Sequence, residues 1–137
     1  MIRYYRELTR LEMEQTDRER TIVLIPLGAL EQHGNQAPLG TEGRIADVPM
    51  LIFPTIPVGL SMEHLNFCGS ISFKPDTYYH MLYDIGESLA RHGFRKLAFL
   101  VCHGGNAPTA QILSRQLRCD FGILPFVLSC GAFGHPD

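Results

Sequence analysis

Four residues with carboxylate or imidazole side chains could bind one object: Glu31, His33 and His103, which follow apolar runs of the chain, and Glu42, which can return to the same object after a turn. In an extended segment, side chains two residues apart project to the same side, so Glu31 and His33 can face one object. His103 directly follows the apolar residues 97–102 and precedes two glycines. One such residue alone is usually a solvated or capping group, but two similar settings favour ligation of a divalent metal. Oxygen and nitrogen donors without thiolate suit zinc, our first expectation, and also manganese or ferrous iron, with one or two ions per chain.

A second group of residues could handle substrate and protons. Glu63 and His64 lie in a loop, and either could transfer a proton to or from a substrate as a general acid or base. The alternative is an exposed polar pair without a chemical role. After His103, Gly104 and Gly105 allow the backbone to approach a substrate or metal closely, and Asn106 is expected to orient a ligand or bind substrate.

Strand and helix patterns alternate along the chain, which predicts an α/β domain with a largely parallel sheet. Apolar runs predict strands over residues 21–27, 50–53, 97–102 and 121–128, with a short strand-like piece over 71–73. Capping and helical spacing predict helices over 9–17, from 75 to a stop at Gly93, and over 108–117 with Ala110, Ile112, Leu113 and Leu117 on or near one side. Ligands bind beyond the carboxyl ends of such strands, where Glu31, His33 and His103 fall.

Length and composition limit the possible functions. The 137 residues suit one domain, and the formal charge of −2 supplies no electrostatic footprint for nucleic acid or an anionic membrane. The apolar runs are shorter than the roughly 18 residues needed to span a bilayer, and the polar start is unlike a signal peptide. We therefore expect a cytoplasmic protein with a small-molecule or peptide substrate. The four cysteines show no metal or disulfide spacing, so we expect most to be reduced core residues.

Several motifs together resemble the creatininase (creatinine amidohydrolase) family of metal-dependent amidohydrolases. They are Leu8-Thr9, Pro26-Leu27-Gly28, Glu31-Gln32-His33-Gly34, Pro38-Leu39-Gly40-Thr41, Gly59-Leu60-Ser61 with Glu63-His64, Phe67 with Gly69, His92-Gly93-Phe94 and His103-Gly104-Gly105-Asn106. The resemblance implies a three-layer α/β/α domain over residues 1–137. It also implies hydrolysis of a non-peptide C–N bond (amide, cyclic amide or formamide) by a metal-activated water. Glu42 would then bridge two metals, and the chain would form a homo-oligomer.

The chain departs from the family pattern in ways that support an alternative function. Glu42 stands where the family most often has aspartate, and the segment after it is too short for the usual amphipathic helix. A further glutamate ligand expected downstream has no counterpart before Asp137. The domain is therefore interpreted as shortened after Glu42 and at the carboxyl end. The alternative to an enzyme is a catalytically incomplete metal-binding or structural family member, and a cysteine hydrolase using Cys68 is a third hypothesis.

Overall fold

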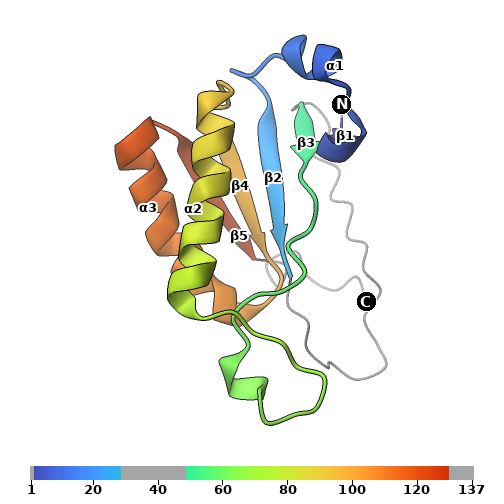
Figure 1. The fold of residues 1–137 in the computed structure, drawn as a ribbon. Helices are drawn as coiled ribbons and strands as arrows, with labels where there is room; N and C mark the ends of the chain where they lie inside the picture. Colours follow the sequence, from blue (N-terminus) through green and yellow to red (C-terminus); the bar gives the residue numbers. More distant parts are fainter. Residues whose placement is uncertain (1, 29–48, 130–137) are drawn as a thin grey trace, which may run out of the picture.

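The strands of the computed structural model form one parallel five-stranded sheet, shown in Figure 1. The structure describes residues 2–28 and 49–129. The strands are β1 (Ile2–Tyr4), β2 (Ile22–Leu27), β3 (Met50–Ile52), β4 (Lys96–Val101) and β5 (Leu124–Ser129), in the order β1-β3-β2-β4-β5. All neighbouring pairs run parallel, which confirms the predicted α/β class. Glu31, His33, Glu42 and the segment expected to be shortened after Glu42 lie outside the described residues.

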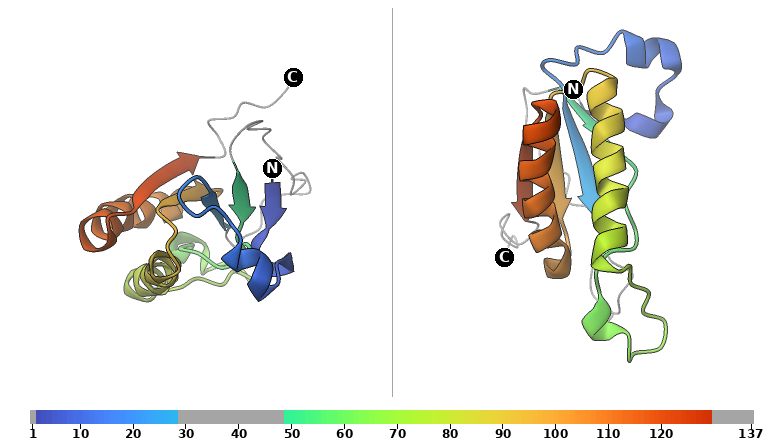
Figure 2. Two further views of the ribbon diagram at one scale, coloured as in Figure 1. Left: turned by 90° about the horizontal axis from the view of Figure 1, so that it is seen from above. Right: turned by 60° about the vertical axis from the view of Figure 1, so that its left-hand side comes forward.

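Two long helices, α2 (Pro75–Arg91) and α3 (Ala107–Phe121), lie side by side over one face of this sheet, as Figure 2 shows. They approach closely because Gly86 of α2 has no Cβ where the Leu117 side chain of α3 packs. The shorter helices are η1 (Tyr5–Glu7), α1 (Arg10–Glu14), η2 (Met62–His64) and η3 (Gly104–Asn106). The α2 and α3 layer accounts for one of the two helical layers that the resemblance implied, and ranges 2–28 and 49–129 contain no further long helix that could form the other layer.

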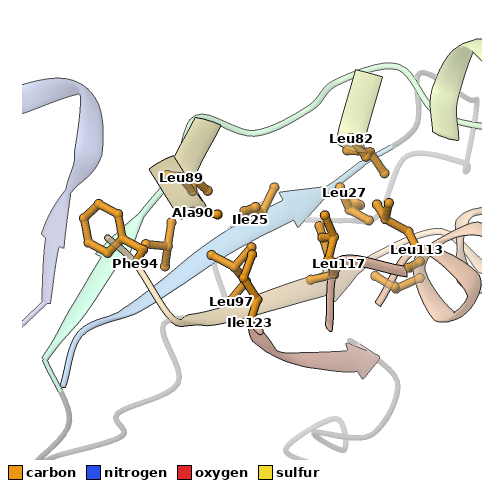
Figure 3. Close-up of a cluster of buried hydrophobic side chains, with 14 of the residues drawn as sticks. Ile25, Leu27, Leu82, Leu89, Ala90, Phe94, Leu97, Leu113, Leu117 and Ile123 are labelled. Atoms are coloured by element: carbon orange, nitrogen blue, oxygen red, sulfur yellow. The ribbon is translucent and has the colours of Figure 1, made fainter. Parts of the chain in front are cut away.

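The core lies between the sheet and these two helices, and Figure 3 shows part of it. Alternate residues of β2 point into it, because successive side chains of a strand face opposite sides. Val23, Ile25 and Leu27 are all fully buried. They pack in one cluster with side chains of both helices, among them Leu82 and Leu113. Truncating a leucine at such a position typically costs about 2–5 kcal/mol, so this layer holds the carboxyl ends of the strands firmly in place.

Local signals set the start of α1 and the end of α2 as predicted, whereas α1 ends at Glu14 and not at residue 17, and α3 runs to Phe121 and not to residue 117. Thr9 and Glu12 form the predicted capping box at the start of α1. Gly93 follows α2 with a φ of 89°, a conformation that favours glycine. Gly122, with a φ of 65°, ends α3 in the same way. The prediction of a strand from residue 121 is therefore wrong at its start, because α3 continues to Phe121 and β5 begins at Leu124.

Three other predictions are corrected by the structure. Ile112 is 62% exposed on the outer side of α3, while its neighbour Leu113 is buried. Residues 71–73 do not form one of the five strands. Cys68, Cys102 and Cys119 are reduced but exposed, so they are not core residues. None of the described helices is both long and apolar enough to cross a membrane.

The strand order places a natural binding position at the carboxyl ends of β2 and β4. These strands are neighbours, but the strand that follows β2 lies on its β3 side, whereas the strand that follows β4 lies on the opposite side. The connections leaving the two strands therefore diverge, and such switch points are where parallel sheets bind ligands.

Candidate functional site

His103 lies just after the end of β4, at this switch point. Val101, the last residue of β4, pairs with Leu27 of β2, and the Cys102 N–H group donates to the Leu27 carbonyl oxygen at 3.1 Å. The His103 side chain is only 10% exposed, and its Nε2 atom lies 2.7 Å from the Leu60 carbonyl oxygen. A carbonyl oxygen can only accept a hydrogen bond, so Nε2 carries the hydrogen. In the neutral ring the lone pair is then on Nδ1, the nitrogen suited to coordinate a metal.

Helix η2 brings Glu63 and His64 to the same place. The Glu63 Oε1 atom lies 3.6 Å from His103 Nε2 and 3.9 Å from His64 Nε2. The ring centroids of His64 and His103 are 6.4 Å apart. The Glu63 side chain is 58% exposed, and ion pairs of such exposed groups contribute about 0–1 kcal/mol to stability. The group is therefore better placed to exchange protons with a ligand than to stabilise the fold.

The two glycines after His103 have different surroundings. A Cβ atom at Gly105 would collide with the Leu60 carbonyl oxygen and with His103 Nε2, the two atoms of the hydrogen bond described above. Around Gly104, by contrast, the space that a Cβ atom would need is open. The absence of a side chain at residue 105 therefore serves the packing of His103, whereas Gly104 leaves its backbone accessible to a ligand.

Asn106 is fully buried at the start of α3. Its Oδ1 atom accepts a hydrogen bond from the Leu60 N–H group at 2.9 Å, and its Nδ2 atom donates to the Gly28 carbonyl oxygen at 3.0 Å. The side chain thus joins the end of β2 to the loop that precedes η2.

That loop, residues 59–61, is also held from its other side. The Ser61 N–H group donates to Ser72 Oγ at 2.9 Å, and the Phe73 N–H group donates to the Gly59 carbonyl oxygen at 3.0 Å. Sequence reasoning did not identify the Leu60 carbonyl or Ser72 as parts of the site. A backbone carbonyl has no residue signature, and only the resemblance of Gly59-Leu60-Ser61 to a family motif pointed to this loop.

A hollow of about 260 Å³ opens where β4 and β5 end. Its lining includes Cys102, Gly104, Ala107 and Gln111. This volume lies just below that of typical ligand sites, which measure about 300–1,000 Å³. The hollow therefore suits a small chemical group next to Gly104.

The structure brings together His103, Glu63 and His64, whereas the other predicted ligands, Glu31, His33 and Glu42, lie outside the described ranges. Among the residues that the structure does describe, no three His, Cys, Asp or Glu side chains are arranged to hold a metal ion. The donor chemistry at His103 nevertheless fits a divalent metal. Histidine ligands usually donate their second ring N–H to a carbonyl or carboxylate, and His103 donates to Leu60.

Fold and site together define an α/β protein with an imidazole and carboxylate group at the switch point of a parallel sheet. The family model described as creatinine amidohydrolase matches residues 6–135. The chain therefore belongs to the creatininase family.

Among its relatives are the mycofactocin precursor peptide peptidases of Mycobacterium ulcerans and Mycobacterium tuberculosis. The first is 35% identical over 116 residues, covering 72% of this chain and 46% of the relative. The second is 37% identical over 103 residues, covering 61% and 41%. The creatinine amidohydrolase of Pseudomonas putida is 29% identical, covering 63% and 38%. The chain thus spans less than half the length of these relatives.

Solved structures agree with this assignment. A creatininase with manganese matches with a TM-score of 0.73 at 27% identity, covering 95% of this chain and 59% of the other. A Zn–Zn form of a creatininase variant matches with the same TM-score and identity, covering 97% and 60%. These matches and the parallel sheet place the chain in the α/β fold of creatininases.

Proposed function

We propose that this chain carries the site of a metal-dependent amidohydrolase that cleaves a non-peptide amide C–N bond. The observation that carries the proposal is the convergence of His103, Glu63 and His64 at the β2–β4 switch point. The names of the relatives support the reaction class, because both an amidohydrolase and a peptidase hydrolyse C–N bonds.

Support for a divalent metal comes from the donor types and from the relatives. Creatininase structures that resemble this chain are described with manganese and with zinc. In our proposal His103 binds through Nδ1, and Glu31, His33 and Glu42 supply the remaining ligands expected from the sequence. When bound, a divalent metal would supply an activated water and polarise the amide carbonyl.

The chain's own residues would transfer protons and bind the substrate. Glu63 and His64 lie within 4 Å of each other, so a proton taken up by one can pass to the other and on to the leaving nitrogen. The open space beside Gly104 leaves its exposed backbone accessible to a substrate. The neighbouring hollow would receive the small group attached to the amide.

Metal content and hydrolysis of the purified chain test this proposal together. We expect zinc or manganese to bind and hydrolysis of creatinine or a simple formamide to stop when a chelator removes the metal. A short unmodified peptide is the comparison substrate. If the chain cleaves this peptide faster, its substrate bond is a peptide bond and the non-peptide part of our proposal is wrong. Absence of bound metal after incubation with either ion would overturn the metal site itself.

A variant pair separates the roles of the described residues. Glu63→Gln keeps the size of the side chain but cannot take up a proton, so we expect turnover to fall about 10²–10⁴-fold while metal content is retained. His80→Ala, an exposed position on α2 that lies outside the proposed site, is the matched control and should keep full turnover. Full activity of Glu63→Gln would remove Glu63 from the mechanism.

A further inference from the structure

We infer that Asn106 is a positioning residue, which acts through Leu60 to hold His103 in its Nε2–H tautomer. The inference rests on the proposed function, in which His103 presents Nδ1 to a metal. It replaces the direct substrate contact that the sequence suggested for Asn106, because a fully buried side chain offers no atom to a substrate.

The backbone of Leu60 lies between the two side chains. Its N–H group donates to Asn106 Oδ1 at 2.9 Å, and its carbonyl oxygen accepts from His103 Nε2 at 2.7 Å. Leu60 is 46 positions from Asn106 and 43 from His103, so the chain itself does not fix this arrangement. The Asn106 carboxamide therefore places the carbonyl that selects which ring nitrogen of His103 carries the hydrogen.

The second end of the carboxamide makes this support rigid. Asn106 Nδ2 donates to the Gly28 carbonyl oxygen, 78 positions away at the end of β2. The Asn106 backbone N–H group also donates to the His103 carbonyl oxygen at 3.1 Å. An asparagine supplies one acceptor and one donor at a fixed separation, whereas an ionised aspartate only accepts and an alanine does neither. The residue type thus matches its two partners.

Packing around the carboxamide leaves it little freedom to move. A Cβ atom at Gly59 would collide with both polar atoms of the Asn106 side chain and with the Gly28 carbonyl oxygen. The Gly59 backbone therefore passes close beside the amide, and a side chain at residue 59 would displace the amide from its two partners. A shift of the Asn106 side chain would therefore move the Leu60 carbonyl, and with it the His103 ring.

The test is the tautomeric state of His103 in the metal-free, ¹⁵N-labelled chain, measured by long-range ¹H–¹⁵N correlation spectra. His103→Gln assigns the signals. We expect one Nε2–H tautomer in the parent protein and a mixture of tautomers in Asn106→Ala. Ser114→Ala is the control, because it removes another buried hydrogen bond of α3, that to the Ala110 carbonyl, and should leave the His103 signals unchanged.

Asn106→Asp provides a second variant that keeps the side-chain volume. It retains the acceptor for the Leu60 N–H group, so we expect it to keep the single tautomer although the Gly28 bond is lost. Mixed tautomers in Asn106→Asp, or a single unchanged tautomer in Asn106→Ala, would overturn the inference.

Zinc affinity supplies an independent readout. Loss of a partner that orients a histidine ligand typically weakens metal binding 10–100-fold, and we expect a loss of this size in Asn106→Ala but not in Ser114→Ala. If the parent binds no zinc while Asn106→Ala still mixes the tautomers, the proposed function fails and the positioning role stands. Unchanged zinc affinity in Asn106→Ala would refute the link to the metal.

Discussion

At the scale of single residues, the hydrogen bond from His103 Nε2 to the Leu60 carbonyl restricts which side chains fit at the positions next to it. The bond is 2.7 Å long and lies in a part of the site where His103 is 10% exposed. Gly105 borders both of its atoms, whereas the space at Gly104 is open. Two adjacent glycines of one motif therefore meet different physical demands.

We predict that Gly105→Ala destabilises the protein by about 1–3 kcal/mol, because the added methyl group overpacks the His103–Leu60 contact. Gly104→Ala should change stability by less than about 0.5 kcal/mol, as is usual for substitutions into open space. Denaturant unfolding of the two variants measures the difference. Equal stabilities would show that the Leu60 carbonyl moves aside without cost.

The pair also separates folding from substrate handling. If Gly104 offers its backbone to substrate, Gly104→Ala should lower turnover while its unfolding midpoint stays that of the parent. Normal turnover in Gly104→Ala would exclude a close substrate approach at this residue.

At the scale of elements, α2 and α3 are joined by a polar link as well as by the Gly86–Leu117 contact. The Tyr83 hydroxyl donates to Asp120 Oδ2 at 2.8 Å, and Gln116 donates to both oxygens of the same carboxylate at 2.9 Å. The bonds from Gln116 and, to a smaller extent, Tyr83 hold the pKa of Asp120 below its ordinary value. The same carboxylate raises the pKa of Tyr83 to about 12.

These pKa shifts define the pH range in which the link stabilises the fold. Asp120 has a lowered pKa in the folded protein, so its contribution is present above its unfolded pKa of 3.8 and is lost as pH falls through the folded value. Tyr83 has a raised pKa, so its contribution is complete below 10.0 and is lost as pH rises through about 12. The link is therefore intact throughout the neutral range.

We predict that Tyr83→Phe raises the pKa of the Asp120 carboxyl group, because the ionised form loses a hydrogen bond. Gln116→Ala should raise this pKa further, since Gln116 is the larger cause of its depression. Carbonyl ¹³C shifts followed across acidic pH measure both values. Tyr79→Phe, one turn away on α2, is the control and should leave the Asp120 titration in place. A larger rise in Tyr83→Phe than in Gln116→Ala would reverse the order of causes.

At the scale of the whole molecule, the described residues place large apolar side chains, beside Lys96, on the sheet face opposite α2 and α3. The register places Leu124 and Phe126 of β5 beside Lys96 and Ala98, on the side away from the core residues Leu97 and Phe99. Leu124 is 39% and Phe126 is 40% exposed. At the other edge of the sheet, Ile2 and Tyr4 of β1 are 42% and 40% exposed. Strands apolar on both faces are typical of sheets that are covered on both sides.

We predict that the chain self-associates through this face and that Phe126→Lys weakens the association at least about tenfold, because it places a charge where apolar surface is buried. Sedimentation velocity over a range of concentrations gives the dissociation constants. Ile112→Lys is the matched control, because Ile112 is 62% exposed on the far side of the molecule, on α3. A parent protein that stays monomeric, or an equal effect of both variants, would contradict this prediction.

Sequence alone was enough to predict the α/β class, the parallel sheet and the long helix α2. The signals behind these predictions are local. An unbroken apolar run predicts a strand at residues 21–27, and the proline, apolar spacing and glycine of residues 75–93 bound a helix whatever the rest of the chain does. The order of strands was not predictable in this way, because it depends on pairing between distant segments.

For the candidate site, too, the residue types were predictable from the sequence and their arrangement was not. His103, Glu63 and His64 were identified by their side-chain chemistry and by resemblance to a family, since residue types and short motifs are visible in a sequence. The tertiary structure decided that Glu63 lies 3.6 Å from His103, and that Asn106 points its amide at the backbone of Leu60 and Gly28 and not at a ligand. A backbone carbonyl leaves no mark on the sequence, and no local pattern brings residues more than 40 positions apart into contact. Only the folded chain therefore determines which nitrogen of His103 carries the hydrogen.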